Sequence, residues 1–206
     1  MFALIDNQQI TKFYSGNRGV TLGDIQYPKS IFTLWSEAER NAIGIFEVTV
    51  DTTNKKDEQW YINTNVSYGV ESNKAVGSYG AATAKAHADT LYTAQDEIDG
   101  KGIEGEVATR GLKYNLIKNL KTSVANELAR TDWYITRNTE KSTAIPSAIT
   151  THRDLVRTRQ ATMETQITNA SDTPALETLY AYVNTADEGD PVVMERPLGE
   201  LPTLDS

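Results

Sequence analysis

A glycine-rich stretch near the middle of the chain is the first place where residue types and spacing point to chemistry. Gly100, Gly102 and Gly105 form a G-x-G-x-x-G pattern. Such a pattern cradles a dinucleotide pyrophosphate where a strand leads into it and a helix follows. Here an alanine-rich segment of helical character precedes the glycines, and the carboxylates of Asp99 and Glu104 flank them. We therefore interpret the glycines as a loop between two helices and not as a nucleotide site.

The two histidines, His87 and His152, are the next residues that could do chemistry. Neither stands in an H-x-x-x-H or H-E-x-x-H spacing, and the chain contains no cysteine. The sequence therefore presents no zinc-ligand motif, and we predict no metal site. For His152, which is followed by Arg153, we expect packing or hydrogen bonding on a helix face.

Motifs for nucleophilic or carboxylate catalysis are also missing from the sequence. There is no Gly-x-Ser-x-Gly nucleophile elbow and no phosphate-binding loop that ends in Gly-Lys-Ser/Thr. Adjacent carboxylates such as Asp57 and Glu58 lie in polar stretches, whereas a glycosidase needs one acid in an apolar setting that raises its pKa. We therefore predict that the protein is not an enzyme and has no catalytic residue and no cofactor.

The acidic composition narrows the classes of partner. The 206 residues carry a formal net charge of −8 at pH 7, and the pI is about 4.8. A nucleic-acid backbone is bound by clustered Lys and Arg, and no long basic run occurs, so we expect no nucleic-acid partner. The N-terminus lacks the features of a secretory signal, and no apolar run reaches the length of a bilayer span. We therefore expect a soluble chain with no membrane partner.

The elements that position the side chains begin with β-type segments. Residues 2–5 and 10–13 are apolar, with turn residues between them, and predict an N-terminal hairpin. Ser36 and Glu39 form a capping box, which predicts a short helix over residues 37–42. Three further β-type runs, at residues 45–50, 60–68 and 75–79, complete a β-rich docking module over residues 1–80.

Helical patterns dominate the middle of the chain. Residues 81–98 are alanine-rich, without Gly or Pro, and predict a first helix that the glycine cluster ends. Residues 106–130 predict a second helix, because apolar residues recur along it at three- and four-residue spacing. After a polar loop at residues 138–143, Pro146 starts a third helix that runs to Ile167.

A last short helix over residues 175–183 and an extended, proline-rich tail over residues 185–206 follow. The fold class is therefore α+β, with a small N-terminal β-rich module, a helical region over residues 81–184 that contains a long helix hairpin, and the tail. Helices of about twenty residues are about 30 Å long. A pair of such helices leaves part of its apolar stripes exposed, so we expect a homo-oligomer in which the tail lies on a neighbouring subunit.

Basic and aromatic side chains near the third helix are the candidate interaction residues. Arg153 and Arg157 stand one helical turn apart, and two interpretations stay open for them. They either form a solvated face with local ion pairs, such as one to Asp154, or hold an acidic helix end or loop of a neighbour. Trp133 and Tyr134 close the second predicted helix, and we interpret them as a hydrophobic cap on the hairpin.

One block of the sequence resembles a known family. Residues 131–167 contain Asp132-Trp133, a polar spacer, Pro146, and then the run His152-Arg153-Asp154-Leu155-Val156-Arg157. This block resembles tail-associated virion proteins of tailed bacteriophages, notably of the marine phage and cyanophage type, and the C-terminal part of phage tail-fibre assembly proteins. The family more often has Tyr at the position of His152. The opening residues 1–13, the segment 27–48 and the ending 196–206 are also similar to such proteins.

The resemblance implies a structural component of a bacteriophage tail, either a tail fibre, a fibre adaptor or a baseplate-associated protein. It implies other phage tail or baseplate proteins as partners, a place in the virion tail after synthesis in the host cytoplasm, and a link to host attachment. A tail-fibre assembly chaperone and a head-decoration protein are the alternatives. The interaction residues it indicates are Trp133, Tyr134, Pro146, His152, Arg153 and Arg157.

Overall fold

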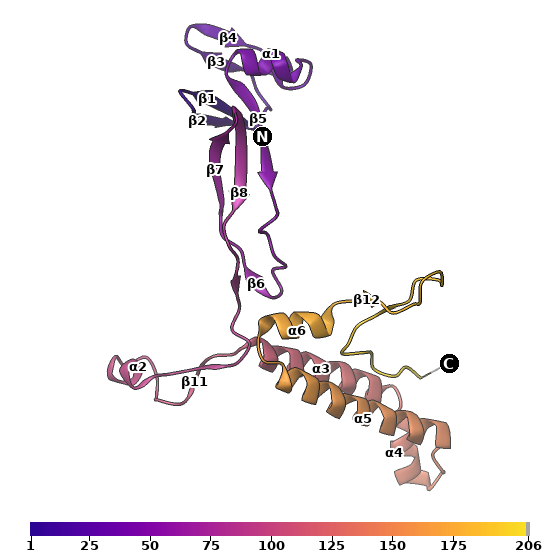
Figure 1. Cartoon of the computed structure of the whole chain (residues 1–206). Helices are drawn as coiled ribbons and strands as arrows, with labels where there is room; N and C mark the ends of the chain where they lie inside the picture. The colour runs from indigo at the N-terminus through magenta and orange to yellow at the C-terminus, as the bar shows by residue number, and fades with distance from the viewer. Residues whose placement is uncertain (205–206) are drawn as a thin grey trace. The chain divides into compact units, whose positions relative to one another are not determined.

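The computed structural model describes residues 1–204, and the chain divides into two compact units, Met1–Thr83 and Ala84–Ser206 (Figure 1). Strands dominate the first unit and helices dominate the second, which confirms the predicted α+β class. Within the described residues, no helix combines the length and the apolar character that crossing a membrane requires.

The first unit is built on a five-stranded sheet of order β2-β1-β5-β8-β7. Only β5 and β8 run parallel, and every other neighbouring pair is antiparallel. The strands are β1 (Phe2–Asp6), β2 (Gln9–Tyr14), β5 (Ile45–Asp51), β7 (Val66–Glu71) and β8 (Lys74–Tyr79). The predicted N-terminal hairpin and the predicted strands at residues 45–50 and 75–79 are confirmed.

The two outer strands of this sheet lie next to each other. The rings of Phe13 on β2 and Tyr68 on β7 meet edge to face, with centroids 5.0 Å apart. The Gln8 side-chain amide donates to Asn73 Oδ1 at 2.6 Å, which joins the turn of one hairpin to the turn of the other. The sheet therefore curls so that each outer strand covers the other, which protects edges that would otherwise pair with foreign strands.

The core of the first unit gathers where a helix and a small hairpin cover one end of the sheet. The hairpin is β3 (Val20–Leu22) with β4 (Ile25–Tyr27), followed by the 3-10 helix η1 (Lys29–Phe32) and by α1 (Glu37–Ala42). The capping box at α1 is confirmed, because Ser36 and Glu39 exchange hydrogen bonds between backbone and side chain. The buried side chains are Val20, Ile31, Phe32 and Ile45.

The predicted strand over residues 60–68 is interrupted in the structure. Only β6 (Tyr61–Ile62) and the beginning of β7 are extended. Between them the Asn63 side chain accepts from the Lys56 backbone N–H and donates to the Lys56 carbonyl, both at 2.8 Å. This side chain ties down the preceding loop, and the strand breaks because the local polar bonds compete with sheet pairing.

The predicted alanine-rich helix over residues 81–98 is wrong for most of its length. The segment contains β9 (Thr83–Ala84), β10 (Thr90–Leu91) and only one helical element, α2 (Ala94–Ile98). The carbonyls of Ala86 and His87 accept the N–H groups of the next long helix at 3.0 Å, so they are not available for a helix of their own. Intrinsic propensity is a weak preference that such contacts override.

An arm, defined as residues 90–109, replaces that helix. Its strand β10 pairs antiparallel with β11 (Val107–Thr109), and α2 and the glycine loop lie between the two strands. Gly100 and Gly105 have left-handed φ angles of 72° and 83°, so they make the turns of this loop. The glycines therefore join a helix to a strand, whereas the sequence predicted a loop between two helices.

The second unit contains an antiparallel pair of long helices, α3 (Leu112–Ala129) and α5 (Ser147–Asn169), which lie side by side in Figure 1. The second predicted helix thus begins at residue 112 and not at 106. Lys113 Nζ donates to the Thr168 carbonyl at 2.8 Å at one end of the pair. Along the pair, the buried apolar side chains are Leu116, Leu120 and Val124 on α3 and Ile149, Val156, Met163 and Ile167 on α5.

A third helix, α4 (Asp132–Lys141), lies between α3 and α5 in the chain. It covers residues 138–141 of the predicted polar loop over residues 138–143, whereas the predicted end of the second helix at residue 130 lies within one residue of the end of α3. Trp133 and Tyr134 therefore lie at the beginning of a separate helix and do not close the second one. The loop that remains starts at Ser142, which has a left-handed φ of 52° and ends α4.

The C-terminal segment folds back on its own chain. After α6 (Thr173–Tyr180), β12 (Val183–Asn184) pairs with β13 (Met194–Glu195). Leu198 is buried, its N–H donates to the Leu179 carbonyl at 2.9 Å, and its carbonyl accepts from Arg159 Nη2 at 2.6 Å. Around Leu198 the tail therefore contacts α5 and α6 of its own chain, and the expected contact of the tail with a neighbouring subunit stays a prediction.

Candidate interaction surfaces

Arg153 joins the end of α3 to the beginning of α4. Its Nη1 donates to the Leu128 carbonyl at 2.8 Å, to Thr131 Oγ1 at 2.7 Å and to Asp132 Oδ1 at 2.8 Å. The last carbonyls of a helix lack partners within the helix and attract a cation. The sequence left open whether Arg153 binds a helix end of a neighbouring subunit. In the structure this arginine is buried and binds an acidic helix end of its own chain.

His152 lies beside Arg153 and faces the same end of α3. Its Nε2 is 3.0 Å from Glu127 Oε1, and Arg130 Nη1 donates to the other oxygen of this carboxylate at 3.0 Å. Burial acts to raise the pKa of Glu127, but Arg130 and His152 outweigh it, and the pKa of Glu127 is lowered. The histidine is only 5% exposed, and its contact with Glu127 is the packing and hydrogen bonding that the sequence indicated.

Arg157 and Pro146 lie on either side of this junction along α5. The Arg157 side chain is exposed and approaches Asp154 at 3.4 Å, which is a local ion pair of the kind expected for a solvated face. Pro146 precedes the first turn of α5, and its carbonyl accepts from the Ile149 N–H at 3.0 Å. Within residues 1–204, no side-chain hydrogen bond or ion pair joins Arg157 or Pro146 to Arg153.

Trp133 and Tyr134 form an aromatic pair on α4. Their ring centroids are 4.0 Å apart, and the Arg137 guanidinium lies 5.7 Å from the centre of the Trp133 ring. Trp133 is 51% exposed, so it does not act as a buried cap on the helix pair. The structure thus brings the buried His152 and Arg153 to the junction where Asp132 begins α4, and leaves Trp133 on the surface beside it.

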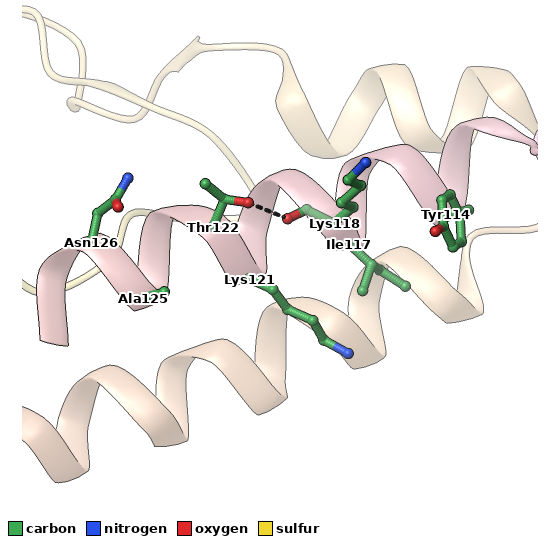
Figure 2. A pocket seen from close by; sticks show the side chains of 7 residues that line it. All are labelled: Tyr114, Ile117, Lys118, Lys121, Thr122, Ala125 and Asn126. Carbon is green, nitrogen blue, oxygen red and sulfur yellow. Dashed lines mark hydrogen bonds between the residues drawn. The ribbon is translucent and has the colours of Figure 1, made fainter. Parts of the chain in front are cut away.

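The outer face of α3 is a surface that the sequence analysis did not identify. A groove of about 540 Å³ follows this face over three turns (Figure 2). The sequence analysis assigned α3 a single apolar stripe, but Tyr114, Ile117 and Ala125 continue the apolar surface of the helix beyond the buried residues Leu116, Leu120 and Val124. The groove is lined by Tyr114, Ile117, Lys118, Lys121, Thr122, Ala125 and Asn126.

The groove combines an apolar floor with basic sides. Tyr114 is 42% exposed and has the Arg110 guanidinium 4.2 Å from its ring centre. Figure 2 shows the side chains of Lys118 and Lys121 pointing away from each other, and Lys121 approaches Glu164 at 3.6 Å. No acidic residue lines the groove, so the surface favours a partner that is apolar and negatively charged.

No cluster of His, Asp and Glu suited to a metal ion occurs within residues 1–204. No protein-family model, curated protein or solved structure matches this chain. The function is therefore inferred from the geometry given above and from the resemblance of residues 131–167.

Proposed function

We propose that this chain is a structural component of a bacteriophage tail, as a tail fibre, a fibre adaptor or a baseplate-associated protein, and that it acts by binding other proteins. The observation that carries the assembly role is the groove on the outer face of α3. A groove with an apolar floor on a long helix is a surface that a partner covers. The proposed partners are other tail or baseplate proteins and further copies of this chain.

The tail assignment is supported by the resemblance of residues 131–167 to tail-associated virion proteins. In this chain the block comprises α4, the loop after it and most of α5. Its shared residues Asp132 and Arg153 bond to each other at 2.8 Å and hold the helix junction. The resemblance therefore concerns residues that build the helical unit, which fits a family defined by assembly and not by a reaction.

A structural role is also supported by the burial and hydrogen bonding of His152 and Glu127, residue types that act as general acids and bases in enzymes. His152 is buried and bonded to Glu127, and Glu127 is bonded to Arg130. A general acid or base has to reach the substrate, and this pair faces the inside of a helix junction. The pair thus stabilises the position of α5 against α3.

Mass spectrometry of purified phage particles tests the proposal. After washing at high salt, the particles and then the isolated tails are expected to retain this chain in a fixed ratio to known structural proteins. A tail-fibre assembly chaperone would leave the mature particle, and a head-decoration protein would stay with the heads after the tails are removed. Absence of the chain from washed tails would contradict the proposal.

A further inference from the structure

The tip of the arm is held in one conformation by its own bonds. Tyr92 N–H donates to the Glu106 carbonyl at 2.9 Å, and Gly105 N–H donates to the Tyr92 carbonyl at 3.0 Å. Lys101 Nζ lies 3.0 Å from both Asp96 and Asp99, which ties the glycine loop to α2. A tip that is already ordered loses little conformational entropy when it binds.

Apolar side chains project from this ordered tip into solvent. Ile98 is 78% exposed and Ile103 is 58% exposed, and both are large aliphatic residues. The Glu104 N–H donates to Glu97 Oε2 at 3.1 Å, so the two segments that carry the isoleucines lie together. Most of each isoleucine side chain is therefore open to solvent, on two segments that lie next to each other at the end of the arm.

The arm is also strongly acidic. It carries five carboxylates against a single lysine, and that lysine is already paired with Asp96 and Asp99. The side chains of Glu104 and Glu106 have no hydrogen-bond or ion-pair partner within the described part of the chain. The five carboxylates belong to Asp96, Glu97, Asp99, Glu104 and Glu106.

The arm tip and the groove on α3 are therefore complementary. The tip offers two exposed isoleucines beside unpaired carboxylates, and the groove offers an apolar floor around Ile117 with Lys118 and Lys121 at its sides. We propose that the arm tip of one copy of this chain docks in the α3 groove of another copy. This proposal rests on the proposed assembly function and names the contact that makes it.

Charge decides against the simplest alternative, a symmetric pairing of two grooves. Lys118 and Lys121 lie near the middle of α3, which spans Leu112–Ala129. Two copies related by a two-fold axis through this face would bring the Lys118 side chains of both copies together, and Lys118, unlike Lys121 with its partner Glu164, has no acidic partner among residues 1–204. Contact between arm and groove replaces that repulsion with attraction.

The arm tip and the groove are different surfaces, so a copy that binds one neighbour through its arm can bind a second neighbour through its groove. Such head-to-tail association closes into a ring if the rotation allows it and otherwise extends as a filament. One arm tip in one groove is smaller than the interface of a stable dimer, so a single contact is weak and gains strength when several form in one assembly. Because part of the attraction is between exposed charges, salt weakens it.

Charge reversal with mixing tests the proposal on the full chain. The arm variant is Glu104→Lys/Glu106→Lys, the groove variant is Lys118→Glu/Lys121→Glu, and the matched control is Asp187→Lys/Glu188→Lys in the C-terminal segment. Sedimentation velocity at rising concentration is expected to give the wild type and the control a mean mass above 22.8 kDa. Each variant alone is expected to stay at the monomer mass, with unchanged circular dichroism.

Mixing the two variants is the decisive step. The unchanged arm of one fits the unchanged groove of the other, and the reversed arm fits the reversed groove, so the mixture is expected to regain the wild-type mass. A monomeric wild type, an arm variant that associates like the wild type, or a mixture that stays monomeric would each overturn the proposal. A chain that is monomeric in solution yet present in washed tails would overturn this contact while leaving the tail role in place.

Discussion

Arg153 and Asp132 lie 2.8 Å apart, and their bond joins the first turns of α5 to the first residue of α4. The same guanidinium nitrogen also binds the Leu128 carbonyl and the Thr131 hydroxyl. One buried side chain thus fixes the course of the chain where α3 ends. The role of this residue in the structure is therefore to hold the junction of α3, α4 and α5.

Replacing Arg153 with Met is therefore expected to lower the free energy of unfolding by about 2 kcal/mol, because buried acceptors lose their donor. Urea denaturation followed by circular dichroism measures the change. Arg157→Met is the matched control, since Arg157 is exposed and makes only a local pair with Asp154. Its effect is expected to stay within about 0.5 kcal/mol. Equal effects of both substitutions would show that the junction does not depend on Arg153.

Gly111 precedes the first residue of α3 and lies against the backbone of Ala88, in the segment that crosses the beginning of this helix. A Cβ added at Gly111 would lie 2.3 Å from the backbone carbonyl of Ala88. Since backbone cannot move aside without breaking the bonds of Ala86 and His87 to α3, Gly111→Ala is expected to cost about 3 kcal/mol in urea denaturation. Gly69→Ala is the control, because nothing lies within 4 Å of its added Cβ. A Gly111→Ala protein as stable as the control would contradict this crossing.

The order of the arm tip depends on the charge of Asp96. Hydrogen bonds from the Thr93 backbone and hydroxyl, with a further one from Lys101, lower the pKa of Asp96 from 3.8 to about 2. A depressed pKa in the folded state means that this carboxylate stabilises α2 fully above pH 3.8, and that the contribution is lost as the pH falls towards 2. The Thr93 amide resonance is expected to titrate with a midpoint near 2.

Asp96→Asn is expected to abolish this titration, whereas Glu106→Gln, which changes a carboxylate on the same arm, leaves it in place. NMR spectra recorded between acidic and neutral pH follow both variants. A midpoint at the ordinary value of an aspartate in the wild type would show that the capping bonds do not hold the tip.

Gly199 holds the C-terminal segment close to α5. It has a left-handed φ of 70°, and an added Cβ would lie 1.5 Å from Arg159 Nη2, which binds the Leu198 carbonyl. Gly199→Ala is therefore expected to release this segment and to speed its cleavage in limited proteolysis several-fold. Gly189→Ala carries a similar backbone strain, with φ of 96° but no neighbour within 4 Å, and is expected to change cleavage less. Identical cleavage of both variants would contradict the Arg159 contact.

The elements that the sequence predicted correctly are those whose signals are local. Alternating apolar residues and turn types define the first hairpin, and the bonds of Ser36 and Glu39 define α1. Both signals act within a few residues, so no distant contact could override them. The third predicted helix, which became α5, has a long apolar repeat of the same local kind.

The errors arose where distant contacts decide the structure. Residues 81–98 have high helix propensity, but their carbonyls bind the beginning of α3, and Asp89 accepts from the Gly111 N–H at 2.8 Å. The sequence also could not show that Arg153 binds its own chain, because its acceptors lie more than 20 residues away. The α3 groove was missed because its residues share the helical period of the buried stripe, and only packing against α5 separates the two faces.

Acylation of Lys118 in the groove tests most directly whether this chain works through the outer face of α3. The reagent would be applied to the dilute purified protein, to the urea-unfolded protein as a reference, and to intact phage tails. Lys118 is expected to react in the purified protein nearly as fast as in the unfolded reference and to be protected several-fold in the tails. Reaction at the same rate in tails and in purified protein would contradict the account.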